Sequence, residues 1–226
     1  MTGTILAGGE NKRIPVLKGH IEINGQRIID SSVNLLKNFF DRVIISTNTP
    51  ELYFYCGVPM IGDIIKQRGP VTGIFSVLSN TGDDIFVTAC DMPFIKPELI
   101  SYMVDKYKAE NTERKIQNEI PLSLPSPSRG EGKGGGESLN AGLKNWDAVI
   151  PVFEVRPQPL LGIYSKNILS VIEKRLRKEL RSARDMLTEL KVLYIKEEEV
   201  REIDPEGRSF VNINTMEDYK KIVNSV

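Results

Sequence analysis

The stretch that decides the fold lies at residues 2–18 and reads TGTILAGGENKRIPVLK. A short, β-prone apolar run at residues 4–6 ends at Gly8-Gly9, and the cations Lys12, Arg13 and Lys18 follow within one loop's length. Two adjacent glycines after a strand allow positive φ angles and let backbone N–H groups approach an anion closely. Cations just downstream would neutralise that anion. The pattern therefore predicts a loop that binds a polyphosphate.

Neither of the two standard phosphate loops is present. The eight-residue P-loop pattern that ends in Gly-Lys-Ser/Thr is absent, and Gly8-Gly9 has no third glycine at the offset of the dinucleotide pattern. A Gly-Gly pair after a strand is also compatible with nothing more than a tight turn, so the glycines alone leave both interpretations open.

Size and composition limit the class of protein. The 226 residues suffice for one sizeable α/β domain, and 30 basic residues balance 30 acidic ones, so no bulk positive field attracts nucleic acid or an anionic membrane. Cys56 and Cys90 suggest neither a disulfide framework nor a zinc site, and Cys90 lies in an apolar run typical of the core. We expect no signal peptide, no membrane span and a cytoplasmic location.

Apolar β-prone runs alternate with helical spacing along the chain. Strands are expected at 43–45, 59–61, 85–90, 147–152, 160–164 and 192–196, and 210–214 also alternates like a strand. Helices are expected at 26–40, through residue 78 after the turn at 69–73, at 97–107, at 167–190, and after the cap Thr215 to Asp218. This alternation predicts a single α/β domain over residues 1–226 with a mainly parallel sheet and right-handed crossovers.

Residues 110–145 differ from the rest. Their centre, LPSPSRGEGKGGGES, is rich in Pro, Ser and Gly and has no apolar periodicity, so it cannot bury enough surface to offset its ordering entropy. We expect a disordered surface insertion at 110–145.

Four turns carry the candidate chemistry. Gly8-Gly9, Asn48, Asp63 and Asp91 each follow an apolar run directly. Because ligands bind beyond the carboxyl ends of parallel strands, these residues are expected to converge on one edge of the sheet.

Each candidate residue at that edge has two interpretations, one as a ligand-binding residue and one as an ordinary capping or solvated residue. Asp91 suits Mg²⁺, which takes one or two protein carboxylates and fills its other positions with phosphate and water, but it could equally cap the turn before Pro93. Asp63 has the same two interpretations. Lys18 and Arg13 could hold phosphates or simply be solvated. His20, the only histidine, follows a glycine in an apparent surface loop, and we do not expect it to be a catalytic base.

Several separated motifs resemble those of one family, the nucleotidyltransferases related to the molybdenum cofactor guanylyltransferase MobA. They are Leu6-Ala7-Gly8-Gly9 with Arg13, Lys18 and Gly25; Asp63 followed by Gly69-Pro70-Val71-Thr72-Gly73-Ile74; Cys90-Asp91-Met92-Pro93-Phe94; Gln158-Pro159-Leu160-Leu161-Gly162-Ile163-Tyr164; and Asn212-Ile213-Asn214-Thr215-Met216-Glu217-Asp218. Together they cover nearly the whole chain except 110–145.

The resemblance implies a Rossmann-like, three-layer α/β fold of the nucleotide-diphospho-sugar transferase type. It implies transfer of GMP from GTP to Mo-molybdopterin, with Mg²⁺ as cofactor and transient contacts to other proteins of molybdenum cofactor biosynthesis or to acceptor proteins. The roles that it implies for single residues are the following: Leu6, Ala7, Gly8, Gly9 and Lys18 at the guanine nucleotide, Asn48 and Asp63 at its base and ribose, Asp91 at Mg²⁺, Lys18, Arg13 and Asp91 in catalysis, and Asn212 and Asn214 on the pterin side.

Two departures from the family pattern keep other functions open. Where the family has Met-Gly-x-Asp-Lys, this chain has Ile14-Pro15-Val16-Leu17-Lys18, so Pro15 removes a backbone N–H and Leu17 removes a carboxylate. The alternatives are a related nucleotidyltransferase that uses CTP or a sugar phosphate, and a non-catalytic nucleotide or pterin carrier. Asn212 and Asn214 could also serve only as hydrogen-bonding residues ahead of the last helix.

Overall fold

The computed structural model describes residues 1–8, 18–119 and 146–223 of the chain. Its strands are β1 Thr2–Leu6, β2 Glu22–Ile23, β3 Gln26–Arg27, β4 Val43–Ser46, β5 Met60–Ile61, β6 Ile85–Ala89, β7 Ala148–Phe153, β8 Arg156–Pro157, β9 Gly162–Tyr164 and β10 Val192–Ile195. Its α-helices are α1 Ile28–Lys37, α2 Pro70–Thr81, α3 Pro97–Glu119, α4 Leu169–Arg177, α5 Ala183–Met186, α6 Glu197–Ile203 and α7 Met216–Val223. Short 3-10 turns include η1 Lys18–His20, η2 Pro50–Leu52 and η3 Phe54–Cys56.

One central sheet organises the molecule. Its strand order is β10-β7-β9-β6-β1-β4-β5, and β8 pairs with β7 off this path. The pairs β1–β4, β1–β6, β4–β5 and β10–β7 are parallel, whereas β9 runs antiparallel to both β6 and β7. The prediction of a mainly parallel α/β sheet is therefore confirmed, with β9 and the short β8 running against the other strands.

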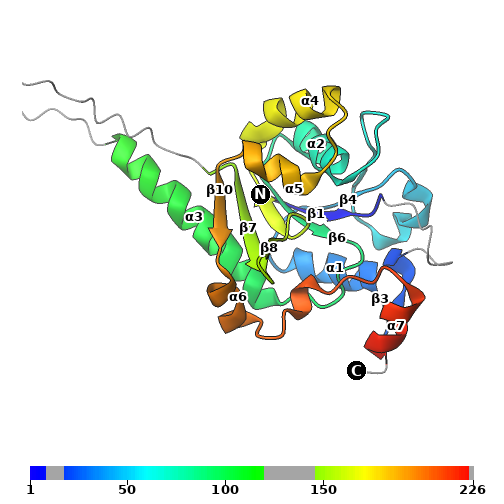
Figure 1. Cartoon of the computed structure of the whole chain (residues 1–226). Coiled ribbons are helices and arrows are strands. Elements are labelled where there is room, and N and C mark those ends of the chain that lie inside the picture. Colours follow the sequence, from blue (N-terminus) through cyan, green and yellow to red (C-terminus); the bar gives the residue numbers. More distant parts are fainter. Residues whose placement is uncertain (9–17, 120–145, 224–226) are drawn as a thin grey trace, which may run out of the picture.

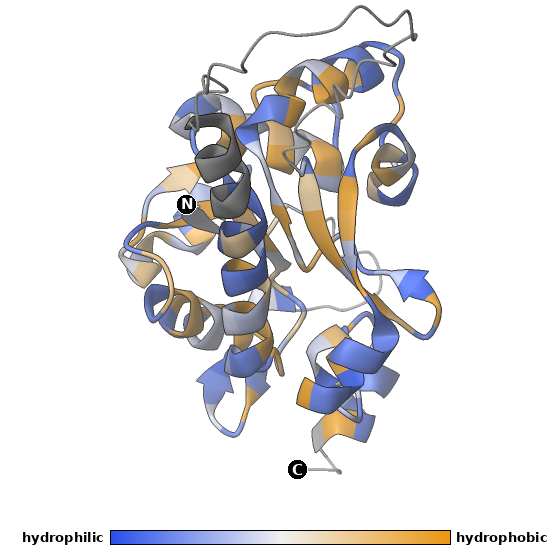
Figure 2. Ribbon diagram, turned by 90° about the vertical axis from the view of Figure 1, so that its left-hand side faces the viewer, coloured by the Kyte–Doolittle hydropathy of each residue, from blue (hydrophilic) through white to orange (hydrophobic). Residues whose placement is uncertain are grey.

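Helices cover both faces of this sheet and complete three layers (Figure 1). Helices α1, α3 and α6 pack on one face, where Leu36, Met103 and Val200 belong to one apolar core. Helices α2, α4 and α5 pack on the other face around a second core. The strands between them are strongly hydrophobic (Figure 2), as strands buried on both faces must be.

The first helix starts later than the spacing suggested. Residues 26–27 form strand β3, which pairs with β2 in a hairpin, and α1 begins at Ile28. The turn between these strands is Asn24-Gly25, with φ values of 51° and 76°. Because both residues adopt positive φ, this dipeptide suits the tight turn that a two-residue hairpin requires.

The predicted start of the insertion is wrong. Helix α3 does not stop near residue 107 but continues through Glu119, so residues 110–119 are helical. The Nε1 of Trp146 donates a hydrogen bond to Oε2 of Glu110 at 3.1 Å, which brings the chain after the insertion back beside α3. Residues 120–145, the rest of the predicted insertion, lie outside the described residues.

Two other expectations need correction. The stretch 167–190 is not one helix: α4 ends at Arg177, Glu179 adopts a left-handed φ of 59°, and α5 begins only at Ala183. A non-glycine residue in that region cannot continue a helix. The stretch 210–214 is not a strand. Its first residue ends the turn η6 Arg208–Phe210, and Ile213 is buried between the hairpin and α7.

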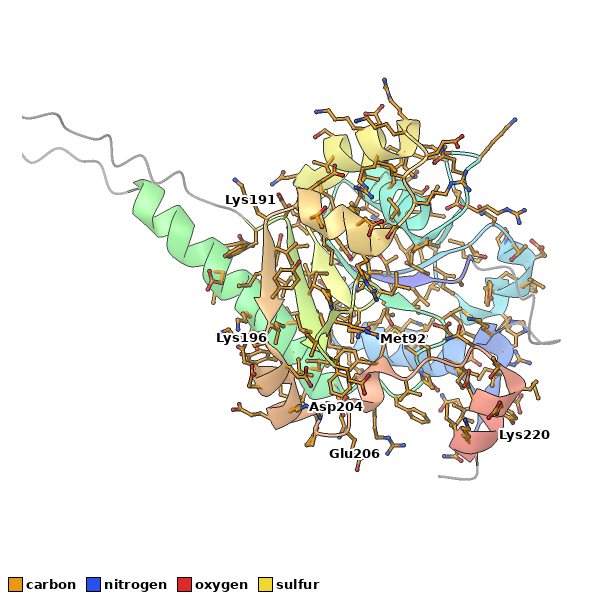
Figure 3. The ribbon with its side chains drawn as sticks, in the orientation of Figure 1. Met92, Lys191, Lys196, Asp204, Glu206 and Lys220 are labelled. Atoms are coloured by element: carbon orange, nitrogen blue, oxygen red, sulfur yellow. The ribbon has the colours of Figure 1, made fainter. Side chains whose placement is uncertain are left out.

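The sheet ends at β10 with charged flanks. Figure 3 shows Lys191 and Lys196 at the two ends of this edge strand. Lysine beside an exposed strand edge hinders pairing with a further strand, so this edge is protected against edge-to-edge association. No helix in the described part of the chain is long and apolar enough to cross a membrane.

Candidate functional site

A pocket of about 200 Å³ opens at the carboxyl ends of β1, β4 and β6. Its walls come from sequence segments that are far apart, as is usual at this edge of a parallel sheet. The residues that line it are Leu6, Ala7, Gly8, Lys18, Ser46, Thr47, Asn48, Tyr53, Asp63, Gly69, Pro70, Gly73, Ala89, Cys90, Asp91 and Leu160. The predicted convergence of Gly8, Asn48, Asp63 and Asp91 on one edge is therefore confirmed.

Lys18 is the centre of the polar network in this pocket. Its Nζ donates to Oδ2 of Asp91 at 2.8 Å and to Oδ1 of Asn214 at 2.5 Å. The Lys18 and Asp91 side chains keep 23% and 14% of their surface exposed, so the ion pair lies at the pocket surface and can exchange partners with a ligand. Residues 18, 91 and 214 thus meet at one point.

The segment that carries Asn214 is fixed from both sides. The carbonyl of Asp91 accepts a hydrogen bond from the N–H of Ile213 at 3.0 Å. Oδ2 of Asp218 accepts from the N–H groups of Asn214 and Thr215, and Oγ1 of Thr215 accepts from the N–H of Asp218. This reciprocal cap confirms the helix start that was predicted at Thr215 and holds the 213–215 backbone against Asp91.

A second polar pair lies on the other side of the pocket. Nδ2 of Asn48 donates to Oδ2 of Asp63 at 2.6 Å, and the N–H of Asp63 donates to Oδ1 of Asn48 at 2.7 Å. Partial burial raises the pKa of the Asp63 carboxyl above its usual value, although the hydrogen bond from Asn48 opposes this shift. The two side chains therefore present one rigid unit at the ends of β4 and β5.

The first turn of α2 closes the pocket between these two groups. Gly69 adopts a φ of 148°, a conformation that glycine accepts readily, and Pro70 opens the helix. A Cβ atom at Gly73 would lie 2.9 Å from Oγ of Ser46 and 3.1 Å from Cδ2 of Leu6. The glycine lets α2 approach β1 and β4 closely, and its absent side chain keeps the pocket open.

The predicted site residues fall into three groups. Those that line the pocket are Leu6, Ala7, Gly8, Lys18, Asn48, Asp63 and Asp91. Asn214 reaches the same place through Lys18, whereas Nδ2 of Asn212 donates to the carbonyl of Phe210 at 3.0 Å and Asn212 does not line the pocket. Gly9 and Arg13, like Pro15 and Leu17, lie outside the described residues.

Some contributions were not anticipated. Tyr53 and the first turn of α2 line the pocket, and no motif in PELYFYC marks that tyrosine. Cys90 is buried, as expected, with 8% of its surface exposed, and it also lines the pocket. Burial raises the pKa of its thiol to about 12. His20 does not line the pocket, and its Nε2 lies 3.0 Å from the carbonyl oxygen of Leu52.

The donor set fits a hard divalent cation that shares its ligands with phosphate. Among the described residues no group of three or more His, Cys, Asp or Glu side chains is arranged to hold a metal on its own. Asp91 offers a carboxylate at the pocket surface beside Lys18. Mg²⁺ commonly binds through one or two carboxylates and completes its shell with substrate phosphates and water.

Comparisons with known proteins agree with this geometry. Residues 3–118 match the model of the MobA-like NTP transferase domain. The chain is 32% identical over 218 residues to a probable molybdenum cofactor guanylyltransferase of Peptoclostridium acidaminophilum, covering 96% of this chain and 86% of that protein. It is 29% identical to the molybdenum cofactor guanylyltransferase of Desulfosudis oleivorans, covering 98% and 93%.

Solved structures share the fold. The molybdopterin-guanine dinucleotide biosynthesis protein A of Archaeoglobus fulgidus superposes with a TM-score of 0.75 at 24% identity, covering 100% of this chain and 98% of that one. A Mycobacterium tuberculosis protein solved in complex with manganese superposes with a TM-score of 0.58 at 12% identity, covering 100% and 98%. The fold, the pocket and the domain match lead to one conclusion: the chain belongs to the family of MobA-like NTP transferases.

Proposed function

We propose that this protein is a molybdenum cofactor guanylyltransferase, which transfers GMP from GTP to Mo-molybdopterin and releases pyrophosphate. The observation that carries the proposal is the contact of Lys18 with Asp91 and Asn214 at the pocket that Lys18, Asp91 and Gly8 line. A cation, a carboxylate and the glycine after β1 together suit a triphosphate. Full-length relatives that carry this name support the choice of substrates.

The pocket suggests how GTP would lie. Asn48 and Asp63 form the hydrogen-bonding pair on one side and would hold the base and ribose. Leu6, Ala7 and Gly8 at the end of β1 would contact the nucleotide, and Lys18 would neutralise its phosphates. Asn214, next to Lys18 on the opposite side from the Asn48–Asp63 pair, would face the pterin substrate.

The reaction needs placement and charge neutralisation more than proton transfer. An oxygen of the terminal phosphate of molybdopterin would attack the α-phosphorus of GTP, forming one P–O bond while the bond to pyrophosphate breaks. A phosphate monoester has a second pKa near 6, so it is mostly dianionic at neutral pH and needs no general base. The position of His20 outside the pocket lining is consistent with this. Lys18 would stabilise the charge on the departing pyrophosphate.

We further propose that Asp91 holds Mg²⁺. When bound, the ion would neutralise the phosphate charge and align the attacking and leaving oxygens. Asp91 would hold the ion, and Lys18 would hold a phosphate oxygen beside it. Both side chains lie at the pocket surface, so a ligand can reach them without opening of the core.

A pyrophosphate-release assay with GTP, Mg²⁺ and Mo-molybdopterin tests the proposal. Release that depends on all three components is expected, and its absence would refute the function. Two substitutions of substrate distinguish the related transferases. CTP or ATP replaces GTP in one assay, and a sugar phosphate replaces Mo-molybdopterin in the other. An Asp91→Ala variant should lose activity. If Asp91→Ala still supports the function in cells while wild-type protein binds GTP, the protein is a carrier instead.

A further inference from the structure

Tyr53 is a buried tyrosine whose hydroxyl has no hydrogen-bond partner within residues 1–8, 18–119 and 146–223. It stands between the turns η2 and η3, lines the pocket, and is 2% exposed. Among the residues that the structure describes, no donor or acceptor pairs with its hydroxyl. Three other tyrosines do find partners: the hydroxyls of Tyr102, Tyr107 and Tyr164 donate to Glu199, Asp84 and the carbonyl of Pro159. Because buried polar groups are normally paired, the exception at Tyr53 needs an explanation.

The hydroxyl lies beside the turn that carries Lys18, and the tyrosine lines the pocket. The Tyr53 oxygen is not among the fully covered, unpaired polar atoms of the described residues. A Cβ atom at Gly19 would lie 3.5 Å from that oxygen, and after burial itself the Cys90 thiol contributes most to raising the pKa of Tyr53. Gly19 and Cys90 directly follow and precede the two residues of the ion pair, Lys18 and Asp91.

The ring is held in this position from several sides. The His20 ring meets it edge-on at 5.4 Å between centroids, and Nε2 of His20 contacts the carbonyl of Leu52, the residue before Tyr53. A Cβ atom at Gly19 would come within 3.3 Å of Cε1 of Tyr53, so the glycine makes room for the ring. A fixed ring presents its hydroxyl to a ligand at little entropic cost.

The chemistry of the hydroxyl indicates what it would bind. Burial raises the pKa of Tyr53 well above its usual range, so the group stays neutral and can donate a hydrogen bond at physiological pH. An ammonium and a carboxylate, suited to a phosphate and its cation, line the same pocket. An anionic oxygen is the acceptor that gains most from a neutral donor in a partly desolvated site.

We propose that the Tyr53 hydroxyl donates a hydrogen bond to a phosphate oxygen of the substrate, beside the phosphate contact of Lys18. The inference rests on the proposed function and adds a binding residue to it. The phosphate belongs either to the nucleotide or to the terminal phosphate of the pterin, and the chemistry is the same in both cases.

Tyr53→Phe removes only the oxygen and is the direct test. The dissociation constants of GTP and guanosine in the presence of Mg²⁺ are measured by displacement of a fluorescent guanine nucleotide. GTP binding should weaken about 10- to 100-fold, the usual worth of one hydrogen bond to a charged group, while guanosine binding stays unchanged. If GTP binding is unchanged but KM for Mo-molybdopterin at saturating GTP rises by a similar factor, the pterin phosphate is the acceptor.

Tyr107→Phe is the matched control. Tyr107 donates to Asp84 at the opposite end of β6, so its loss should lower the unfolding temperature without changing either substrate's binding. Tyr53→Phe should leave the unfolding temperature unchanged, because its hydroxyl makes no hydrogen bond to another described residue. Unaltered GTP binding together with unaltered KM for the pterin, or equal weakening of GTP and guanosine, would overturn the inference. If wild-type protein binds no nucleotide at all, the proposed function itself fails.

Discussion

At the scale of single residues, the contact between Lys18, Asp91 and Asn214 is the most informative feature of the molecule. One ammonium group serves two acceptors from distant parts of the chain, at 2.8 and 2.5 Å. Because the Lys18 and Asp91 side chains both remain partly exposed, the pair contributes little to stability and is free to serve a ligand. The pair matters because it places an ammonium and a carboxylate where a ligand can bind them.

Replacing Lys18 by glutamine should therefore impair catalysis far more than folding. We expect kcat for pyrophosphate release to fall by about 10²-fold or more, since a preorganised charge opposite a leaving group is worth roughly that much. Lys191→Gln, at the exposed edge of the sheet, is the control and should keep wild-type kcat. A Lys18→Gln enzyme with normal kcat would contradict the assignment of Lys18.

Asp63 predicts a pH dependence of stability. Burial raises its pKa above the ordinary value of 3.8 in the folded protein, so the folded state binds this proton more tightly than the unfolded state. Its contribution to the free energy of unfolding therefore decreases as pH rises through the raised pKa. Asp63→Asn removes the carboxylate and can keep an oxygen that accepts from Asn48 Nδ2.

Urea unfolding at pH 4 and pH 7 measures this effect. The free energy of unfolding of Asp63→Asn minus that of wild type should be larger at pH 7 than at pH 4. The variant therefore gains stability relative to wild type as the pH rises. An equal difference at the two pH values would show that Asp63 titrates alike in the folded and unfolded chain.

At the scale of elements, turns rather than α-helices or strands place the charged and amide side chains of the site. Lys18 belongs to η1, Asn48 follows β4, Asp63 follows β5, and Asn214 precedes α7. The strands set where each turn begins, and local caps such as Thr215 with Asp218 set how it continues. The turn that follows α6 is likewise shaped by a local cap. The carboxylate of Asp204 (labelled in Figure 3) accepts hydrogen bonds from the N–H groups of Arg208 and Ser209.

Gly207 in that turn should not tolerate a side chain. It adopts a φ of 66°, and a Cβ atom would lie 2.0 Å from the ring of Phe153, which stacks on Phe210 at 4.9 Å. We expect Gly207→Ala to lower the free energy of unfolding by roughly 2–4 kcal/mol, from backbone strain and overpacking together.

Gly82→Ala separates the two causes of that loss. Gly82 has a similar φ of 64°, but a Cβ atom there would meet nothing within 4 Å. Its replacement should cost about 1 kcal/mol, from strain alone. Equal losses for the two variants in urea unfolding would mean that contact with Phe153 is unimportant.

At the scale of the whole molecule, one contact joins the chain before and after residues 120–145. Trp146 donates to Glu110, 36 positions earlier, so α3 and the start of β7 lie side by side at this point. Because closing a loop costs little more for a long loop than for a short one, a domain tolerates a long connection between neighbouring elements. The match to the MobA-like domain, residues 3–118, ends in the same region.

Residues 112–145 should therefore be dispensable. Replacing them with a flexible linker of about eight Gly and Ser residues, long enough to join neighbouring ends, should leave one cooperative unfolding transition and a GTP dissociation constant within about twofold of wild type. Calorimetry and nucleotide binding measure the two properties. A second transition or lost binding would assign this segment to the domain core or to the site.

Much of the molecule can be predicted from local pattern. The runs IFVTAC and VIIS are continuous and apolar, as strands buried on both faces must be, and each ends in polar turn residues, so their edge of the sheet follows from the order of elements. The helical periodicity at 167–190 misled because it does not register the single left-handed residue Glu179 that divides the segment. The extension of α3 through Glu119 was missed because polar residues without periodicity leave helix and coil equally plausible.

The sequence by itself determined which side chains stand at the carboxyl ends of the strands, because side-chain order along a strand and the direction of parallel crossovers are local properties. Only the tertiary structure decided that Asn214 shares Lys18 with Asp91, that Asn48 pairs with Asp63, and that Tyr53 lines the same pocket. These are contacts between segments up to 196 positions apart. Their geometry depends on how the layers pack, and no local pattern in the chain encodes it.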